Sequence, residues 1–441
     1  MSTAVTRSGG ERPDVLPEPE QPRVRDRADR ARQLRLVVTF GIVTAVLLLL
    51  ALLVDDPHVT YILGERVTRD QQPHSLNGRP VSWAAVVVAA VALVLAALNR
   101  YPRGAVEVAL GLLVGVMAYL GFLMWAYADQ GEGFVSAIAN PIPGTVRIAT
   151  PIVLGALAGV LCERAGVINI AIEGQFLAGA FFASVAASLA FQPYTGLVGG
   201  VLAGVGIAAL LGLFALRYQV NQVVLGVVLV ALASGLTSFL LGQIPGDPDV
   251  KQYFNEPPTL PQLRIPGLAD IPLVGDALFN QTLLVYLMYL SVGTVTFLLY
   301  QTRWGLRVRS VGEHPKAADT VGIKVNRTRW QAVLLGGVFA GLGGAYYTVG
   351  STGAFDRDVS AGTGFIALAA VIMGRWHPLG ATAAAVFFGF MLNLQTQISF
   401  VDKLPSELLG AVPYLATIIA VAGFVGRVRP PAADGEPYVK S

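Results

Sequence analysis

The chain has 441 residues, of which 54% are hydrophobic and only 13% are charged. In a soluble protein roughly a quarter of the residues are charged. Because the apolar residues here form long uncharged blocks, the composition excludes a set of soluble domains and predicts an all-α protein that crosses a membrane many times. The charged residues are concentrated in 1–35 (8 Lys/Arg, 6 Asp/Glu) and 301–330 (7 Lys/Arg, 2 Asp/Glu), so the basic excess of +3 indicates membrane orientation and not a nucleic-acid surface. The single cysteine excludes an internal disulfide.

Residues 1–35 are polar and lack apolar periodicity. We expect a cytoplasmic tail without a fold of its own. It does not resemble a secretory signal, because no small-residue cleavage site follows a short apolar stretch. Arginines that lie next to the first apolar block are typical of the cytoplasmic side; here they are Arg23, Arg25, Arg27, Arg30, Arg32 and Arg35.

Nine blocks are apolar over about 20 residues, the length that a helix needs to cross a bilayer. They are Leu36–Val54, Val81–Leu98, Ala105–Tyr127, Gly196–Leu216, Asn221–Leu241, Thr282–Tyr300, Arg329–Gly350, Leu379–Ile398 and Leu408–Gly426. Two further regions are less regular. Residues 144–191 form two apolar stretches with a polar interruption, and Gly362–Gly374 is too short to cross alone. The sequence thus predicts about 10–12 transmembrane helices or half-helices.

The connections between these blocks alternate in charge. If the N-terminal tail is cytoplasmic, the basic connections at 99–104 and 301–328 also fall inside, as does the C-terminal tail 427–441. The proline-rich segment 245–282 then falls outside. The alternation obeys the positive-inside rule, so we expect both termini in the cytoplasm and the protein in the cytoplasmic membrane.

The sequence contains a weak internal repeat. Residues 149–213 run as a span, a polar break, a glycine-rich segment and another span, and residues 329–393 follow the same order. Short, glycine-interrupted segments at corresponding places in two halves are typical of a translocation site.

The polar break in the first half contains Asn169 and Glu173, four residues apart. On a helix these two side chains share one face. A carboxylate at membrane depth is costly unless it meets water or a donor. One interpretation is a polar lining beside an aqueous path. The other is a structural role, in which Glu173 holds a helix end or pairs with Arg164; the residues alone leave both open.

The basic connection at 301–328 contains a short predicted helix, Lys316–Val321. Pro315 suits the first turn of a helix and Gly322 suits the position just past its end. Ala317, Ala318 and Val321 would form a small apolar face. So short a helix is unstable by itself, which fits docking into the groove of a partner; the pattern alone favours the alternative, an ordinary solvated loop.

Several other residues are weaker signals. Glycines at four-residue spacing predict close helix packing: Gly196, Gly200 and Gly204, and Gly337 and Gly341. Amides in late spans could bind a polar solute, although helix cross-linking is the favoured role for each: Asn221, Gln222, Asn393, Gln395 and Gln397. The sequence has no phosphate-binding loop, no H-E-x-x-H zinc motif and no nucleophile elbow, and its four histidines are scattered. We therefore expect neither an enzyme active site nor a metal site.

Three long runs, at 163–181, 305–330 and 362–381, resemble permease subunits of bacterial ABC importers. The resemblance is to the branched-chain amino acid/ribose-type permease family, and within it to subunits assigned to nucleoside or simple-sugar uptake. It covers about 105–426. The expected organisation is therefore a tail (1–35), two additional transmembrane helices (36–104), a permease core (105–426) and a cytoplasmic C-terminal tail (427–441).

The resemblance implies a bundle like that of type II importers. It also implies three partners: a second, often non-identical permease subunit, a cytoplasmic ABC ATPase and an extracytoplasmic substrate-binding lipoprotein. The chain itself would bind no cofactor and would not be an enzyme, since ATP and Mg²⁺ are used by the ATPase. The expected function is ATP-driven import of a nucleoside. Alternatives are import of a simple sugar or a branched-chain amino acid, a secondary transporter with Glu173 as the ion-coupling group, and a channel or scaffold subunit.

The resemblance also implies roles for single residues. The ATPase-coupling segment of the family matches Glu313, Pro315, Lys316, Ala317, Ala318 and Gly322. The first family signature matches Asn169, Glu173 and Gly174, and with Gln175 these are candidates for the translocation pathway or its gate. Phe365, Asn393 and Gln397 would supply the aromatic and amide groups that a nucleoside pocket needs.

Overall fold

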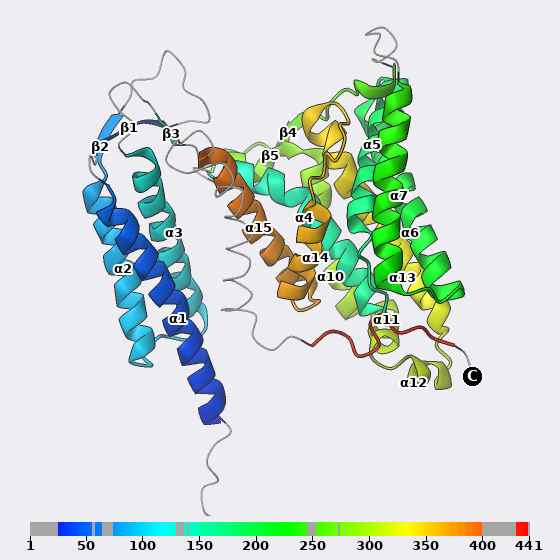
Figure 1. Cartoon of the computed structure of the whole chain (residues 1–441), viewed down its shortest axis with the longest axis horizontal. Coiled ribbons are helices and arrows are strands. Elements are labelled where there is room, and N and C mark those ends of the chain that lie inside the picture. Colours follow the sequence, from blue (N-terminus) through cyan, green and yellow to red (C-terminus); the bar gives the residue numbers. More distant parts are fainter. Residues whose placement is uncertain are drawn as a thin grey trace, which may run out of the picture. The chain divides into compact units, whose positions relative to one another are not determined.

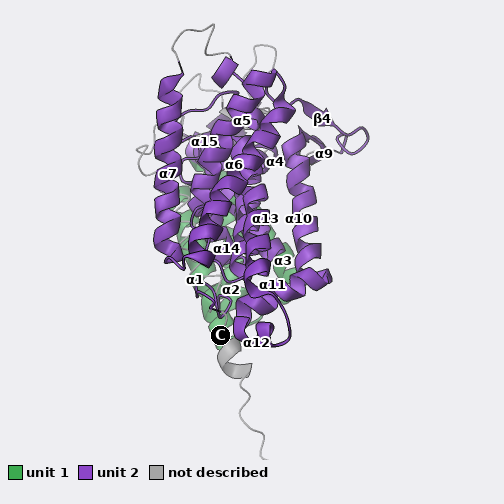
Figure 2. Ribbon diagram, turned by 90° about the vertical axis from the view of Figure 1, so that its right-hand side faces the viewer, with its two compact units in different colours: residues 1–55, 78–125 green, residues 56–77, 126–441 purple. Residues whose placement is uncertain are grey.

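The computed structural model describes residues 25–54, 58–63, 74–128, 136–138, 141–244, 253–271, 274–398 and 429–439. These residues form long helices and a few short strands (Figure 1). Ten helices in these ranges are long and apolar enough to cross a membrane, which confirms the predicted all-α polytopic fold. The predicted span Leu408–Gly426 and residues 1–24 of the tail lie outside the described residues. The chain divides into two compact units (Figure 2).

The first unit, residues 1–55 and 78–125, holds three helices. They are α1 (Arg25–Leu52), α2 (Arg79–Ala97) and α3 (Ala105–Tyr127). Small residues allow close packing, since a Cβ at Gly121 of α3 would lie 3.0 Å from the Cβ of Ala85 in α2. Two ion pairs join the first turns of α1 to the start of α3 and the connection before it. Arg32 pairs with Glu107 at 2.9 Å, and Arg103 pairs with Asp29 at 2.9 Å. The third helix thus packs with the first two, whereas the sequence grouped it with the permease core.

The second unit holds the remaining helices and all the described strands. Its long helices are α4 (Pro141–Arg164), α5 (Ile172–Ala190), α6 (Pro193–Gly212), α7 (Gln222–Gln243), α10 (Leu283–Gln301), α13 (Val325–Tyr346) and α15 (Pro378–Ile398). Shorter helices are α9 (Gly275–Phe279), α11 (Arg303–Glu313), α12 (Pro315–Thr320) and α14 (Thr363–Met373). The 11 residues of α14 confirm the predicted short segment.

Short strands, which the sequence analysis did not predict, join the connections. Strand β1 (His58–Leu63) pairs antiparallel with β2 (His74–Asn77) and parallel with β3 (Ser136–Ile138). Strand β4 (Gln262–Arg264) pairs antiparallel with β5 (Asn280–Thr282). The pairing of β1 with β3 joins two connections that are about 75 residues apart in the chain.

The packing of the second unit follows the internal repeat. Helix α4 packs against α15 and α14, and α13 packs against α6 and α5 in the corresponding way. If α4, α5 and α6 are matched in order with α13, α14 and α15, the contact of α4 with α15 corresponds to that of α13 with α6. The contact of α4 with α14 corresponds in the same way to that of α13 with α5. The two leading helices, α4 and α13, also contact each other, and α4 is buried almost throughout. The sequence repeat thus corresponds to two structural halves that meet along α4 and α13.

Glycines make the closest helix contacts between the halves. A Cβ at Gly204 of α6 would lie 2.5 Å from the carbonyl oxygen of Gly337 and 2.6 Å from the amide of Gly341, both in α13. Real Cβ atoms do not approach backbone so closely, so only glycine fits at this crossing. The predicted packing role of these glycines is confirmed.

Candidate functional site

The chain breaks between α4 and α5, where residues 165–171 are not helical and are largely buried. Helix α4 ends because Gly166 adopts a positive φ of 82°, with the Val167 amide bonded back to the Cys162 carbonyl at 3.0 Å. The amide of Ile168 donates to the Gln222 side chain at 2.8 Å. Non-helical backbone within a membrane bundle persists only where protein or water satisfies it. Gln222 therefore has a structural role at the break.

Glu173 lies in the first turn of α5 and holds the start of α14. Its carboxylate accepts hydrogen bonds from the Ser360 hydroxyl at 2.6 Å, the Gly362 amide at 2.9 Å and the Gly364 amide at 2.6 Å. These amides belong to the N-terminal end of α14, where free N–H groups and the helix dipole favour an anion. Of the two interpretations of Glu173, the structure thus shows the helix-end contact.

One expectation about this segment is wrong, and one alternative that the residues left open for Glu173 is not observed. Asn169 does not share a helical face with Glu173, because α5 begins only at Ile172 and Asn169 lies in the break before it. Arg164 hydrogen-bonds elsewhere: its Nε donates to the Trp376 carbonyl at 2.8 Å and its Nη2 to the Arg375 carbonyl at 3.4 Å. The spacing rule failed because the backbone is not helical there.

The other end of α14 is held by the end of α4. The indole N–H of Trp376 donates to the Glu163 carboxylate, beside the two bonds from Arg164. Arg375 and Trp376 both have positive φ, 55° and 54°, a conformation that side chains rarely adopt and that surrounding contacts must maintain. Helix α14 is therefore fixed at its N-terminal end by α5 and at its C-terminal end by α4.

Asn169 and Gln175 form a completely buried amide pair at the break. The Asn169 Nδ2 donates to the Gln175 Oε1 at 3.2 Å and lies 3.6 Å from the Cys162 sulfur. The Asn169 Oδ1 and the Gln175 Nε2 have no partner among the described residues. An unpaired buried amide is costly, so these two atoms cost stability at the break.

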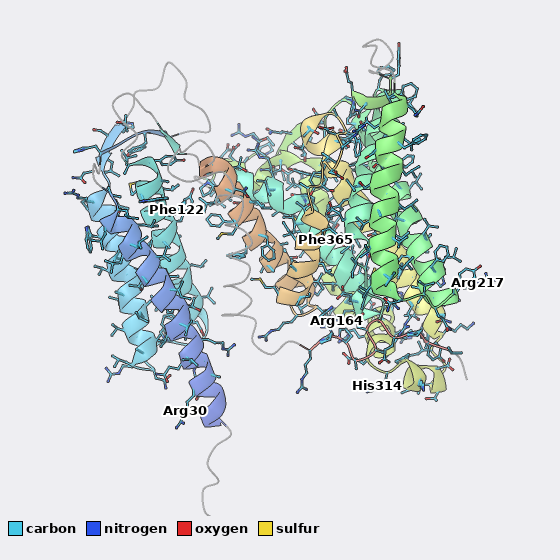
Figure 3. All side chains as sticks on the ribbon, viewed as in Figure 1. Arg30, Phe122, Arg164, Arg217, His314 and Phe365 are labelled. Carbon is cyan, nitrogen blue, oxygen red and sulfur yellow. The ribbon has the colours of Figure 1, made fainter. Side chains whose placement is uncertain are left out.

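The remaining pathway candidates lie elsewhere. Phe365 projects from α14 with 47% of its surface exposed (Figure 3). Asn393 of α15 donates to the Pro141 carbonyl at 3.0 Å and so cross-links α15 to the start of α4. Gln397 is half-buried near the end of α15. Asn221 caps α7, because its side chain accepts from the Val223 amide at 3.0 Å.

Helix α11 occupies much of the predicted basic loop. Thr302 caps its start by accepting a hydrogen bond from the Gly305 amide at 3.1 Å. The side chains of Val308 and Val311 form its buried face. The Arg309 guanidinium lies 4.8 Å from the centre of the Tyr300 ring. The signal for this helix was present, as a capping threonine before residues buried at spacings of three, but the arginines obscured it.

Helix α12 confirms the predicted short helix. It begins at Pro315, and Gly322 beyond its end has a positive φ of 86°. Ala318 is 3% exposed and faces the bundle, whereas Lys316 and Ala317 are exposed and Val321 is 75% exposed. The three apolar residues therefore do not form one face: Ala317 and Val321 point outward, one turn apart, and Ala318 anchors the helix.

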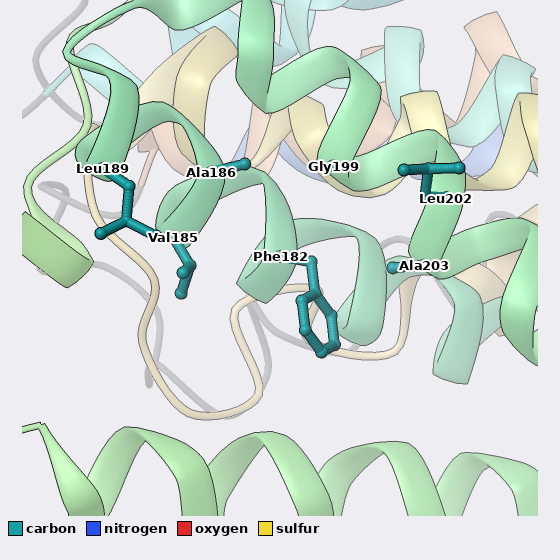
Figure 4. A pocket seen from close by; sticks show the side chains of 7 residues that line it. All are labelled: Phe182, Val185, Ala186, Leu189, Gly199, Leu202 and Ala203. Atoms are coloured by element: carbon teal, nitrogen blue, oxygen red, sulfur yellow. The ribbon is translucent and has the colours of Figure 1, made fainter.

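A pocket of about 400 Å³ lies on the surface of α5 and α6 (Figure 4). Its lining is apolar: Phe182, Val185, Ala186, Leu189, Gly199, Leu202 and Ala203. Without polar side chains it offers nothing that would orient a polar solute.

Residues 141–421 match a protein family described as the permease component of branched-chain amino acid transport systems. The chain belongs to this permease family. It is 38% identical to a guanosine ABC transporter permease protein of Bacillus subtilis, over 69% of this chain and 98% of the relative. It is 37% identical to a nucleoside ABC transporter permease protein of Lactococcus lactis, over 66% and 94%. It is 34% identical to a putative glucose ABC transporter permease protein of Haloferax volcanii, over 59% and 78%. No solved structure matches the chain.

The family match begins at the first residue of α4 and ends before residue 429. It contains the break, α14 and the α11–α12 region, but neither the helices of the first unit nor the described C-terminal segment. Ten apolar helices and membership of a permease family make this a multi-pass membrane protein.

Proposed function

We propose that this chain is a permease subunit of an ATP-driven importer and that its solute is a nucleoside. The observation that carries the proposal is the 38% identity to a guanosine permease protein over nearly the whole length of that relative. A simple sugar is the second candidate, because a putative glucose permease protein is 34% identical. A branched-chain amino acid is the third, from the family description.

In this proposal the chain works with a second permease subunit, an ABC ATPase and an extracytoplasmic substrate-binding lipoprotein. The ATPase holds ATP and Mg²⁺, and this chain supplies the path and the coupling surface. The termini and α12 lie on the cytoplasmic side. The outward residues Lys316 and Ala317 of α12, and Val321 directly after its end, face the ATPase.

The contacts of the second unit give a continuous route from α12 to α14. At the end of α11, a Cβ on Gly312 would clash with the Arg164 carbonyl oxygen, so the two backbones are in direct contact. Arg164 in turn holds the Trp376 carbonyl at the end of α14. A displacement of α12 therefore reaches α4 and α14 through packed backbone. We propose that this displacement releases the start of α14 from Glu173 and opens the bundle beside Asn169 and Gln175.

Uptake by cells tests the solute. A strain without its own nucleoside uptake, carrying the whole operon with or without this chain, is given labelled guanosine, glucose or leucine. We expect uptake of guanosine that needs both this chain and the ATPase gene. Uptake of glucose or leucine instead would support the second or third candidate. Uptake that continues without the ATPase gene would contradict an ATP-driven importer and favour a secondary transporter.

The coupling surface has a separate test. We expect the double variant Lys316→Glu, Ala317→Glu to insert in the membrane but to lose co-purification with the ATPase, because both side chains are exposed on α12. The control is Thr259→Glu, exposed in the segment before β4. Unchanged co-purification of the double variant would count against α12 as the coupling helix.

A further inference from the structure

The C-terminal segment 429–439 has no regular secondary structure, yet it is tied to the second unit at several points. The Ala433 amide donates to the Gly312 carbonyl at 2.9 Å, and the Ala432 amide donates to the Glu313 carboxylate at 3.3 Å. Gly435, with a positive φ of 77°, lies against the Ile168 side chain. Ordering each backbone residue costs about 1–2 kcal/mol, so an irregular segment stays in place only where such contacts hold it.

A buried arginine depends on this segment. Arg329, near the start of α13, is completely buried, and its Nη1 donates to the Glu436 carbonyl at 2.7 Å. Its Nε and Nη2 have no partner among the described residues, and Asp434 and Glu436 are its acidic neighbours. A buried cation is tolerated only with hydrogen bonds and opposite charge around it. The C-terminal segment supplies both.

The same segment completes the small core beneath α12. That core contains one residue from each of four elements, which are Val311 of α11, Ala318 of α12, Val325 of α13 and Tyr438 of the segment. All four are less than 9% exposed, and Asp319 of α12 is an acidic neighbour of the Tyr438 hydroxyl. A helix of six residues is not stable alone. Its position therefore depends on this core, in which Tyr438 is the one large ring.

We propose that residues 429–439 form a C-terminal brace that positions the α11–α12 region against α4 and α13, so that a push on α12 moves the bundle instead of tilting α12 alone. The push itself rests on the proposed function, but the brace is a property of the fold. The family match ends at residue 421, so the brace lies outside the matched core.

Two variants of the full-length chain remove the brace. One is a stop in place of Arg429. The other is Tyr438→Ala, which empties the core beneath α12. Tyr438→Phe keeps the ring and removes only its hydroxyl. Val439→Ala is the matched control, because Val439 is 63% exposed in the same segment.

The first measurement is hydrogen exchange at the α12 amides of purified permease, which needs no transport. We expect exchange at least about tenfold faster in the truncated chain and in Tyr438→Ala, because loss of a buried ring removes more packing energy than a tenfold change requires. Tyr438→Phe should restore most of the protection, and Val439→Ala should match the parent chain. Unchanged exchange in Tyr438→Ala overturns the brace, whether or not the truncated chain folds.

The second measurement is solute transported per ATP hydrolysed in the reconstituted importer. We expect Tyr438→Ala to bind the ATPase and hydrolyse ATP, with a ratio at least about fivefold lower than the parent's. An unchanged ratio overturns the positioning role. If the parent chain transports no solute, the proposed function fails while the exchange result still decides the brace.

Discussion

Glu173 carries its carboxylate at the point where α5 and α14 both begin. Its three hydrogen bonds join residues about 190 positions apart in the chain. The first turns of both helices present N–H groups there, so one negative charge interacts favourably with both helix dipoles. The carboxylate acts as a structural link in this conformation, and opening the bundle would require those bonds to break.

Replacing Glu173 by glutamine separates a structural role from an ion-coupling role. The Gln side chain keeps the shape but turns an NH₂ donor toward backbone donors, so we expect a loss of about 1–3 kcal/mol of stability. Thermal unfolding in detergent measures it. The control is Glu256→Gln, because Glu256 is exposed in the segment before β4. Unaltered unfolding together with lost uptake would show that Glu173 acts in transport and not in stability.

Asp434 makes the C-terminal brace sensitive to pH. Burial raises the pKa of this carboxyl to about 7, against the opposing charge of Arg329 and the hydrogen bond from the Gly435 amide. Glu163, at the end of α4, also interacts electrostatically with Asp434. Because an undocked aspartate has a pKa near 3.9, docking favours the protonated form and is strongest below about pH 4.

We therefore expect docking of the brace to weaken as the pH rises from about 4 to about 7 and to change little above that. Hydrogen exchange at the Ala433 amide, corrected for intrinsic rates, measures it. Asp434→Asn should remove the dependence. A dependence that persists in Asp434→Asn would assign it to another group.

At the scale of helices, the crossing of α6 and α13 depends on the absence of side chains. Gly204 lies against the α13 backbone, whereas a Cβ at Gly206, two residues further along α6, would meet nothing within 4 Å. We expect Gly204→Ala to force the helices apart and to lower the unfolding temperature by several degrees. Gly206→Ala should be neutral or slightly stabilising, since alanine favours a helix. Equal unfolding temperatures for the two variants would contradict the crossing.

The sequence predicted those elements whose signals are local. Pro315 and Gly322 marked the ends of α12, and glycine spacing marked the α6–α13 crossing. It missed α11, because charged residues on the exposed side concealed the buried ones, and it missed the short strands, which depend on pairing between distant connections. It also misjudged Asn169, because Gly166 marks the end of α4 but nothing local shows that the next helix begins only at Ile172. The partners of Glu173 and of the C-terminal segment are long-range contacts that a single sequence does not specify.

At the scale of the whole molecule, the orientation can be tested through the single cysteine. Cys162 is completely buried, so single-cysteine variants at exposed positions should react with a maleimide over a low background. We expect Gln262→Cys in β4 to react with a membrane-impermeant maleimide in intact cells. Lys316→Cys in α12 should react only in opened cells. The reverse pattern would place α12 outside and contradict the coupling proposal.

The attachment of α14 has a consequence for how the protein is made. With 11 residues, α14 is too short to enter a membrane by its own hydrophobicity. The groups that hold its two ends, Glu173 and the pair Glu163 and Arg164, lie in the first half of the repeat and leave the ribosome earlier. Synthesis in this order provides the late segment with a template that is already inserted. A circularly permuted chain in which α14 emerges before α4 and α5 would present it to the translocon without that template.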